Sequence, residues 1–139
     1  MIRRVFVDTD VILDTALARK PFFEASRMVL ALLENRQAIG FVSSNAVGNL
    51  YYILRKAGGN EKARWFLKEL LTYLTVIPMD HSHIVEALDS KFTDFEDALQ
   101  NFTALRNQCE CIVTGNTEDY RQSSLPVYAP LEFLHLFTE

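Results

Sequence analysis

Short apolar runs alternate with longer segments of helical periodicity along this chain, and no other feature restricts the fold as strongly. The pattern predicts strands at residues 4–8, 38–42, 75–79, 111–114 and 127–128, and helices at residues 10–18, 21–35, 44–57, 60–73, 81–89, 94–107 and from 130 onward. Strands that alternate with helices are joined by right-handed crossovers, which make neighbouring strands parallel. The sequence therefore predicts an α/β fold in which helices cover both faces of a parallel sheet.

Size, composition and charge limit the class of protein. The chain has 139 residues, 49% hydrophobic and 23% charged, so residues 1–139 are expected to form a single globular domain. The N-terminus lacks the apolar segment of a signal peptide, and no apolar run is long enough to span a membrane, which favours the cytoplasm. A net charge of −4 argues against a protein that coats nucleic acid by bulk electrostatics. Cys109 and Cys111 are predicted to be partly buried thiols, because two cysteines this close suit neither a disulfide nor a zinc site.

Polar side chains follow each long strand of the predicted sheet. They are Asp8, Thr9 and Asp10 after the first strand, Ser43, Ser44 and Asn45 after the second, Asp80, His81 and Ser82 after the third, and Thr114, Asn116 and Asp119 after the fourth. Ligand sites of parallel sheets form outside the carboxyl ends of the strands. We therefore expect a polar site at this edge.

The stretch VDTDVILD, residues 7–14, places three aspartates among core-type residues. Carboxylates are rarely buried unless they are paired or bind a metal. Asp10 is expected either to cap the following helix or to support Asp8. Asp14, one helical turn later, is expected to face solvent.

The stretch TDFEDALQ, residues 93–100, supplies a second acidic group. Thr93 and Glu96 have the spacing of a capping box at a helix start. Asp94 and Asp97 are three residues apart, so they share a face of that helix. The neighbouring apolar residues predict that the helix packs on the sheet, and Asp97 then needs a partner.

Asp8, Asp97 and Asp119 brought to one edge would raise each other's pKa, and a hard divalent cation removes that cost. Mg²⁺ and Mn²⁺ prefer carboxylate oxygens and water. Such an ion also activates water and stabilises charge on a phosphoryl group. The acidic residues therefore favour metal-dependent phosphodiester hydrolysis.

Four segments resemble the motifs of the PIN domain family, which includes the VapC-like toxins. VFVDTDVILD is similar to the opening strand and D-T-N-x-x-x-D motif, SSNAVGNLYYILRK to the second motif, DFEDALQ to the D-F-x-D-A-L helix, and IVTGNTEDY to the I-V-T-x-N/D-x-x-D-F segment. The late PLEFL also matches, and the order along the chain is the same. The resemblance implies a three-layer α/β/α sandwich with a central parallel sheet of four or five strands. It also implies a ribonuclease that uses Mg²⁺ or Mn²⁺, in many relatives the toxin of a toxin–antitoxin pair.

The resemblance assigns roles to individual residues. Asp8 and Asp97 match the metal-binding acids, Asp119 matches the acid of the last segment, and Asn116 stands where Asp or Asn occurs; Thr9, Ser44 and Thr114 match supporting polar positions, and Asp10 stands where Asn is usual. The implied catalytic residues are Asp8, Asp97 and Asp119, and Asn116 joins them as a metal ligand.

One position departs from the family pattern. The second motif usually has an acid just before L-Y-Y, and here that residue is Asn49. An amide oxygen can coordinate a hard cation but brings no charge, so metal binding should weaken unless Asp10 or Asp94 compensates. The alternative is a PIN-type module that binds nucleic acid or protein with little or no nuclease activity. A further alternative is another α/β phosphohydrolase with Asp8 as phosphoryl acceptor, which requires a lysine that no motif fixes.

Two sets of residues suggest partners. Arg19, Lys20, Arg55 and Lys56 are candidates for a basic rim that contacts RNA, or they are solvated helix faces. The apolar stripe from Trp65 to Leu74 is either core or a surface for a homodimer. The resemblance adds an antitoxin protein as a candidate partner.

Overall fold

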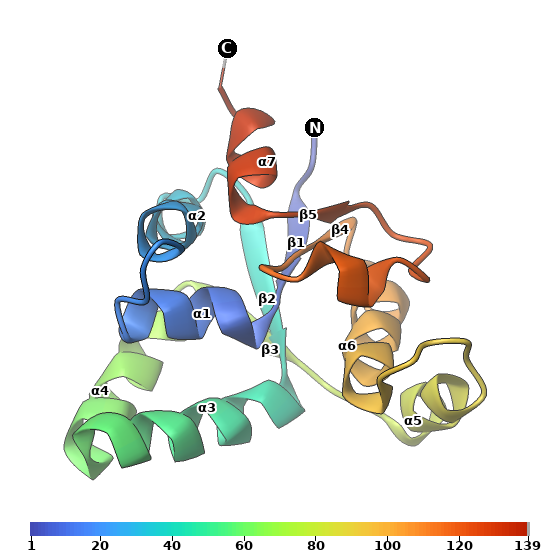
Figure 1. The fold of residues 1–139 in the computed structure, drawn as a ribbon, viewed down its shortest axis with the longest axis horizontal. Helices are drawn as coiled ribbons and strands as arrows, with labels where there is room; N and C mark the ends of the chain where they lie inside the picture. The colour runs from blue at the N-terminus through green and yellow to red at the C-terminus, as the bar shows by residue number, and fades with distance from the viewer. Residues whose placement is uncertain (139) are drawn as a thin grey trace.

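The computed structural model describes residues 1–138 and contains one parallel sheet (Figure 1). Its strands are β1 (Arg4–Val7), β2 (Ile39–Ser43), β3 (Leu74–Ile77), β4 (Cys111–Val113) and β5 (Val127–Tyr128). Their order across the sheet is β3-β2-β1-β4-β5, and every neighbouring pair is parallel. The central strand β1 ends at the middle of the sheet edge, which is where Asp8 follows it.

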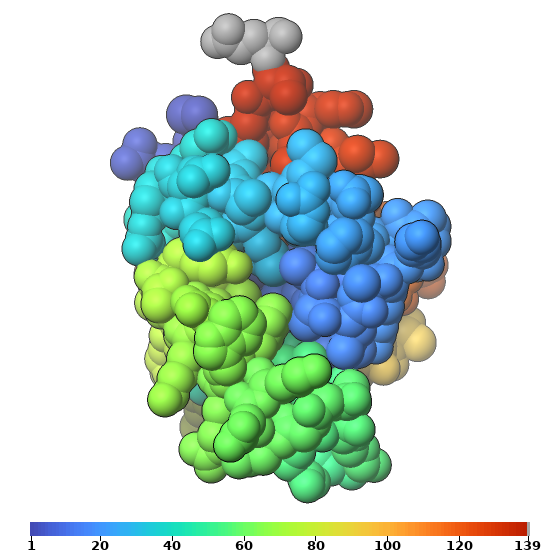
Figure 2. All heavy atoms as spheres, turned by 90° about the vertical axis from the view of Figure 1, so that its left-hand side faces the viewer, coloured from blue at the N-terminus to red at the C-terminus, as the bar shows by residue number. Residues whose placement is uncertain are grey.

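Helices cover both faces of the sheet, so the predicted three-layer α/β/α sandwich is confirmed (Figure 1). One layer contains α1 (Thr9–Ala16), α2 (Phe23–Glu34), α3 (Ser44–Gly58), α4 (Asn60–Leu70) and α7 (Pro130–His135), and the other contains α5 (His81–Leu88) and α6 (Phe95–Arg106). Figure 2 looks onto the first layer, where α1, α3 and α4 lie at the surface. No helix in residues 1–138 is both long enough and apolar enough to cross a membrane.

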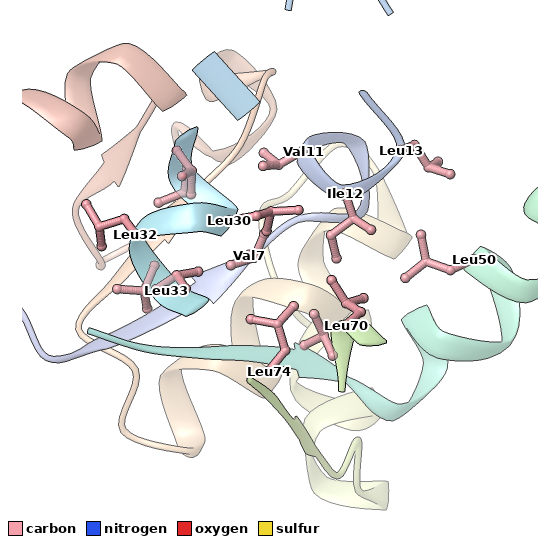
Figure 3. Packing of buried hydrophobic residues seen from close by; sticks show 14 of the residues in the cluster. Val7, Val11, Ile12, Leu13, Leu30, Leu32, Leu33, Leu50, Leu70 and Leu74 are labelled. Carbon is pink, nitrogen blue, oxygen red and sulfur yellow. The ribbon is translucent and has the colours of Figure 1, made fainter. Parts of the chain in front are cut away.

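The core lies on the two faces of the sheet. Val5 and Val7 of β1 point to the layer of α1 to α4, and the intervening Phe6 packs on the α6 side. This alternation is the two-residue period of a strand that is buried on both faces. Figure 3 shows Val7 among apolar side chains of α1 and α2, including Ile12 and Leu33. The packed core holds the ends of β1 and α6 in fixed positions.

The predicted elements agree with the structure within a few residues at their ends, and Cys109 and Cys111 are buried free thiols. Two local predictions are wrong. The residue that caps α6 is Asp94, whose Oδ1 accepts a hydrogen bond from the Asp97 backbone N–H at 3.0 Å, so Thr93 and Glu96 form no capping box. Asp14 does not face solvent: it is only 7% exposed, because Arg19 lies 3.8 Å away and compensates its charge.

Candidate functional site

Asp8 stands between β1 and α1, and its carboxylate is held from three sides. As N-cap of α1 its Oδ1 accepts from the Thr9 backbone N–H at 2.8 Å. Its Oδ2 accepts from Thr114 Oγ1 at 2.9 Å and from the Tyr120 hydroxyl at 3.2 Å. Thr114 follows β4, the strand paired with β1, so the parallel pairing itself brings the two side chains together. These donors fix the orientation of a carboxylate at the centre of the sheet edge.

Asp10 lies in the first turn of α1, beside Asp8. Its Oδ2 accepts from the Gly115 backbone N–H at 2.9 Å. A Cβ atom at position 115 would lie 2.8 Å from that oxygen, so this close approach requires glycine. The other oxygen, Oδ1, is buried and has no hydrogen-bond partner within residues 1–138. Asp10 therefore caps no helix and brings an unsatisfied oxygen to the neighbourhood of Asp8.

Asp97 comes from the opposite layer, in the first turn of α6. Asp8 and Asp97 line one cavity of about 420 Å³, whose other lining residues are Thr9, Asn45, Ala46, Gly48, Asn49, Glu96 and Gln100. Asp97 also lines a neighbouring cavity of about 250 Å³, together with Thr93, Asp94, Glu118, Asp119, Arg121 and Gln122. The structure thus brings the predicted acids Asp8 and Asp97 to the first cavity and Asp119 to the second. Asp97 lines both cavities.

Burial and mutual repulsion make this group of carboxyls hard to ionise. Burial, reinforced by the Asp8 charge, raises the pKa of Asp10 to about 7. Burial also raises the pKa of Asp97 to about 7, with added repulsion from Asp94, Asp119 and Asp8. The pKa of Asp8 is raised by burial, and its hydrogen bonds oppose that shift. Raised carboxyl pKa values of this kind are typical of a site that lacks its counter-charge.

The residues present fit a hydrated divalent cation. Among residues 1–138, no three His, Cys, Asp or Glu side chains are grouped so that they could hold a metal ion together. Mg²⁺, however, keeps several waters and commonly binds through one or two carboxylates. Asp8 and Asp97 supply those carboxylates, and the unsatisfied Oδ1 of Asp10 is an oxygen of the required kind.

Several predicted residues lie outside the two cavities. Asn116 lines neither, and its backbone N–H donates to Thr114 Oγ1 at 3.1 Å. Ser44 is exposed and accepts from the Met79 backbone N–H at 3.3 Å. The basic residues Arg19, Lys20, Arg55 and Lys56 also line neither cavity; Arg19 pairs with Asp14, and the last two lie over the Tyr52 ring.

Sequence-based reasoning assigned no role to three residues of this site. Tyr120 ends a 3-10 helix (Thr117–Tyr120) that no pattern predicts, and only the fold brings its hydroxyl to Asp8. The N-cap of α3 is Ser43 rather than Ser44, and it contacts Gln100. The sequence did contain a signal for Gln100. It lies three residues after Asp97, so the two side chains share a helix face and Gln100 could have been expected near the acids.

The raised carboxyl pKa values predict how stability depends on pH. Between the ordinary aspartate pKa of 3.8 and about 7, folded Asp10 and Asp97 hold protons that the unfolded chain has lost. The free energy of unfolding of the metal-free protein should therefore fall as pH rises through this window. Urea titrations across the window should show the fall, and Mn²⁺ added above it should restore stability.

Asp10→Asn is the matched variant for that measurement. Its amide oxygen can still accept from the Gly115 N–H, but position 10 no longer titrates. The stability of this variant should decline less over the same pH window than that of the wild type. Equal slopes in the two proteins would contradict a raised pKa at Asp10.

Comparison with known proteins identifies the family. The family model described as PIN domain matches residues 4–118. No curated protein sequence matches the chain. Among solved structures, a chain of VapBC2 from Rickettsia felis, bound to a DNA fragment from its promoter, superposes with a TM-score of 0.68 at 16% identity, covering 90% of this chain and 97% of that one.

Two other solved structures show the same fold. VapC20 of Mycobacterium tuberculosis, described as a toxin that cleaves the sarcin–ricin loop, gives a TM-score of 0.65 at 15% identity and covers 88% of this chain and 98% of its own. A chain of a toxin–antitoxin complex from Klebsiella pneumoniae gives 0.66 at 21% identity, with 91% and 97% covered. The family match spans most of the chain, and the solved structures share its fold. The chain therefore belongs to the PIN domain family.

Proposed function

We propose that this protein is a ribonuclease that requires Mg²⁺ or Mn²⁺ and hydrolyses phosphodiester bonds of RNA. The observation that carries the proposal is the shared cavity of Asp8 and Asp97, two carboxyls that come from opposite layers and meet at the strand ends. The family membership and the VapC fold support the same activity. With a volume of about 420 Å³, the cavity has room for a phosphodiester group and a hydrated cation.

In this proposal Asp8 and Asp97 bind the cation, and Asp119 assists from the side of the second cavity. Asn116, which lines neither cavity, assists from the loop that follows β4. When bound, the cation neutralises the acids and polarises the scissile phosphodiester toward attack by water. Thr9, Thr114 and Tyr120 hold the Asp8 carboxylate in its binding orientation. Burial and the Asp8 charge raise the pKa of Tyr120, so its hydroxyl remains a neutral donor.

A second candidate function follows from Asn49. Asn49 is exposed and lines the same cavity as Asp8 and Asp97, at the position where the family pattern has an acid. With this neutral side chain the domain would keep its fold and bind nucleic acid or protein while cutting RNA poorly. The phosphohydrolase alternative is weaker, because no lysine is among the residues that line the cavity.

The direct test is an RNA cleavage assay. The purified chain should cut single-stranded RNA in Mn²⁺ or Mg²⁺ and lose that activity in a chelator. Calorimetry should detect Mn²⁺ binding to the same preparation. A protein that binds RNA but neither Mn²⁺ nor Mg²⁺ would support the binding module instead.

We further infer two protein partners. An antitoxin is proposed because the structural neighbours come from toxin–antitoxin complexes. A pocket of about 420 Å³ between α1, α3 and α4 offers an apolar surface on the face seen in Figure 2. It is lined by Ala16, Leu17, Leu54, Ala57, Gly58, Lys62, Ala63, Trp65 and Phe66.

A homodimer is the other proposed partner. The stripe from Trp65 to Leu74 is divided in the structure: Leu67, Leu70 and Leu74 belong to the core, whereas Trp65 is 64% exposed. Burying this indole against a second copy would remove a large apolar side chain from water. Sedimentation at micromolar concentration should give twice the chain mass of 15.9 kDa, and Trp65→Glu should shift the species toward monomer. A wild-type protein that sediments only as the monomer would rule the homodimer out.

A further inference from the structure

Gln100 has a fixed amide orientation inside the proposed site. It lies one turn after Asp97 on α6 and lines the cavity that contains Asp8 and Asp97. Ser43, fully buried at the end of β2, caps α3 by accepting from the Ala46 backbone N–H at 3.1 Å. The Ser43 hydroxyl proton is then free to donate, and it does so to Gln100 Oε1 at 2.6 Å.

This hydrogen bond determines which end of the amide stays available. Oε1 is occupied by Ser43, and Nε2 makes no hydrogen bond to any residue from 1 to 138. An amide nitrogen has two N–H donors and no acceptor. Gln100 therefore contributes an N–H donor whose orientation is set by a buried serine, and that serine already uses one of the two lone pairs of Oε1.

The charges around the cavity indicate which kind of ligand this N–H donor would bind. The acidic lining residues are Asp8, Glu96 and Asp97, and neither lysine nor arginine is among the residues that line the cavity. A basic side chain here would pair with the carboxylates and compete with a cation for them. A neutral N–H donor does not compete, and it can still bind an anionic oxygen that arrives with the substrate.

We propose that Gln100 Nε2 binds a non-bridging oxygen of the substrate phosphodiester, next to the acids that bind the cation. The inference rests on the proposed nuclease function and adds a substrate-binding residue to it. The cavity then offers two kinds of group: carboxylates for the cation, and an amide N–H donor for the phosphodiester. Asn45 of α3 lines the same cavity and brings a second amide to it.

Gln100→Glu is the sharpest test, because a carboxylate at this position can still accept from Ser43 while it loses both N–H donors. Gln100→Met removes the donors without adding charge. Both variants should bind single-stranded RNA about tenfold more weakly or worse, measured by fluorescence anisotropy in Ca²⁺. In Mn²⁺ their KM for RNA should rise more than kcat falls. Mn²⁺ affinity measured by calorimetry without RNA should not decrease in either variant.

Gln37→Glu is the matched control, since Gln37 is exposed and lines none of the three pockets named above. It should bind RNA and Mn²⁺ as the wild type does, and thermal melting should show that all variants are folded. Wild-type RNA binding in both Gln100 variants would overturn the inference and leave the nuclease proposal standing. Faster cleavage by Gln100→Glu than by the wild type would overturn it too, because the reaction would then proceed without the N–H donors of position 100. A wild-type protein that neither binds Mn²⁺ nor cuts RNA would overturn the proposed function, and the inference with it.

Discussion

Asp97→Asn is expected to abolish both Mn²⁺ binding and RNA cleavage at ordinary metal concentrations. Asp97 and Asp8 are the two aspartates that line the cavity of about 420 Å³, and Asp97 also lines the neighbouring cavity that contains Asp119. Losing one charge–ion contact in a partly solvated site costs on the order of 1–4 kcal/mol at an effective dielectric near 20. That cost corresponds to about one to three decades of affinity. Calorimetry with Mn²⁺ and an RNA cleavage assay on the same protein measure both effects.

Asp94→Asn is the matched control at the same helix end. Asparagine caps helices as well as aspartate does, so α6 should keep its start while one nearby negative charge disappears. This variant is expected to lose much less Mn²⁺ affinity than Asp97→Asn. Equal losses in the two variants would mean that the net charge of the helix end, rather than a contact with Asp97, determines metal binding.

Asn49→Glu is expected to act in the opposite direction and to tighten Mn²⁺ binding about tenfold or more. The side chain is exposed on α3 and faces the cavity of Asp8 and Asp97. A carboxylate there would restore the charge that the family pattern carries at this position. RNA cleavage should rise with metal occupancy, so the gain should be largest at low Mn²⁺ concentration.

The neighbouring amide gives the control for Asn49. Asn45 lies one helical turn earlier and lines the same cavity, so Asn45→Glu adds the same charge at a different point. If Asn49→Glu left metal affinity unchanged while Asp97→Asn abolished it, position 49 would not contact the ion and the alignment of the second motif would be wrong. If the wild type, Asn49→Glu and Asp97→Asn all failed to bind metal or cut RNA in millimolar Mn²⁺, the non-catalytic binding module would replace the enzyme.

The order and type of the elements follow from the sequence, because apolar periodicity and strong helix terminators act locally. The glycine pair Gly58-Gly59 ends α3 within one residue of the predicted end at residue 57, and the apolar run around Val5 and Val7 is typical of a buried strand. Helix starts depend on more than the local residue types. Thr93 and Asp94 are both good caps, and the local backbone selected Asp94. Asp14 was misplaced because its partner Arg19 reaches it through a turn that no periodicity describes.

The acids of the candidate site were also visible in the sequence, since Asp8 and Asp97 stand at a strand end and a helix start with recognisable spacing. Their surroundings were not visible. Tyr120, whose hydroxyl donates to Asp8, follows it by 112 positions in the chain, and Ser43 is separated by 57 positions from Gln100, which it orients. Contacts between residues so far apart in the chain depend on the order of the strands in the sheet and on the packing of the helices. Both result from the local preferences of many segments acting together, so no single segment of the sequence indicates these contacts. Residue types and spacing therefore indicate which side chains could bind a cation, whereas the donors that hold them and the amide that shares their cavity depend on contacts between distant segments.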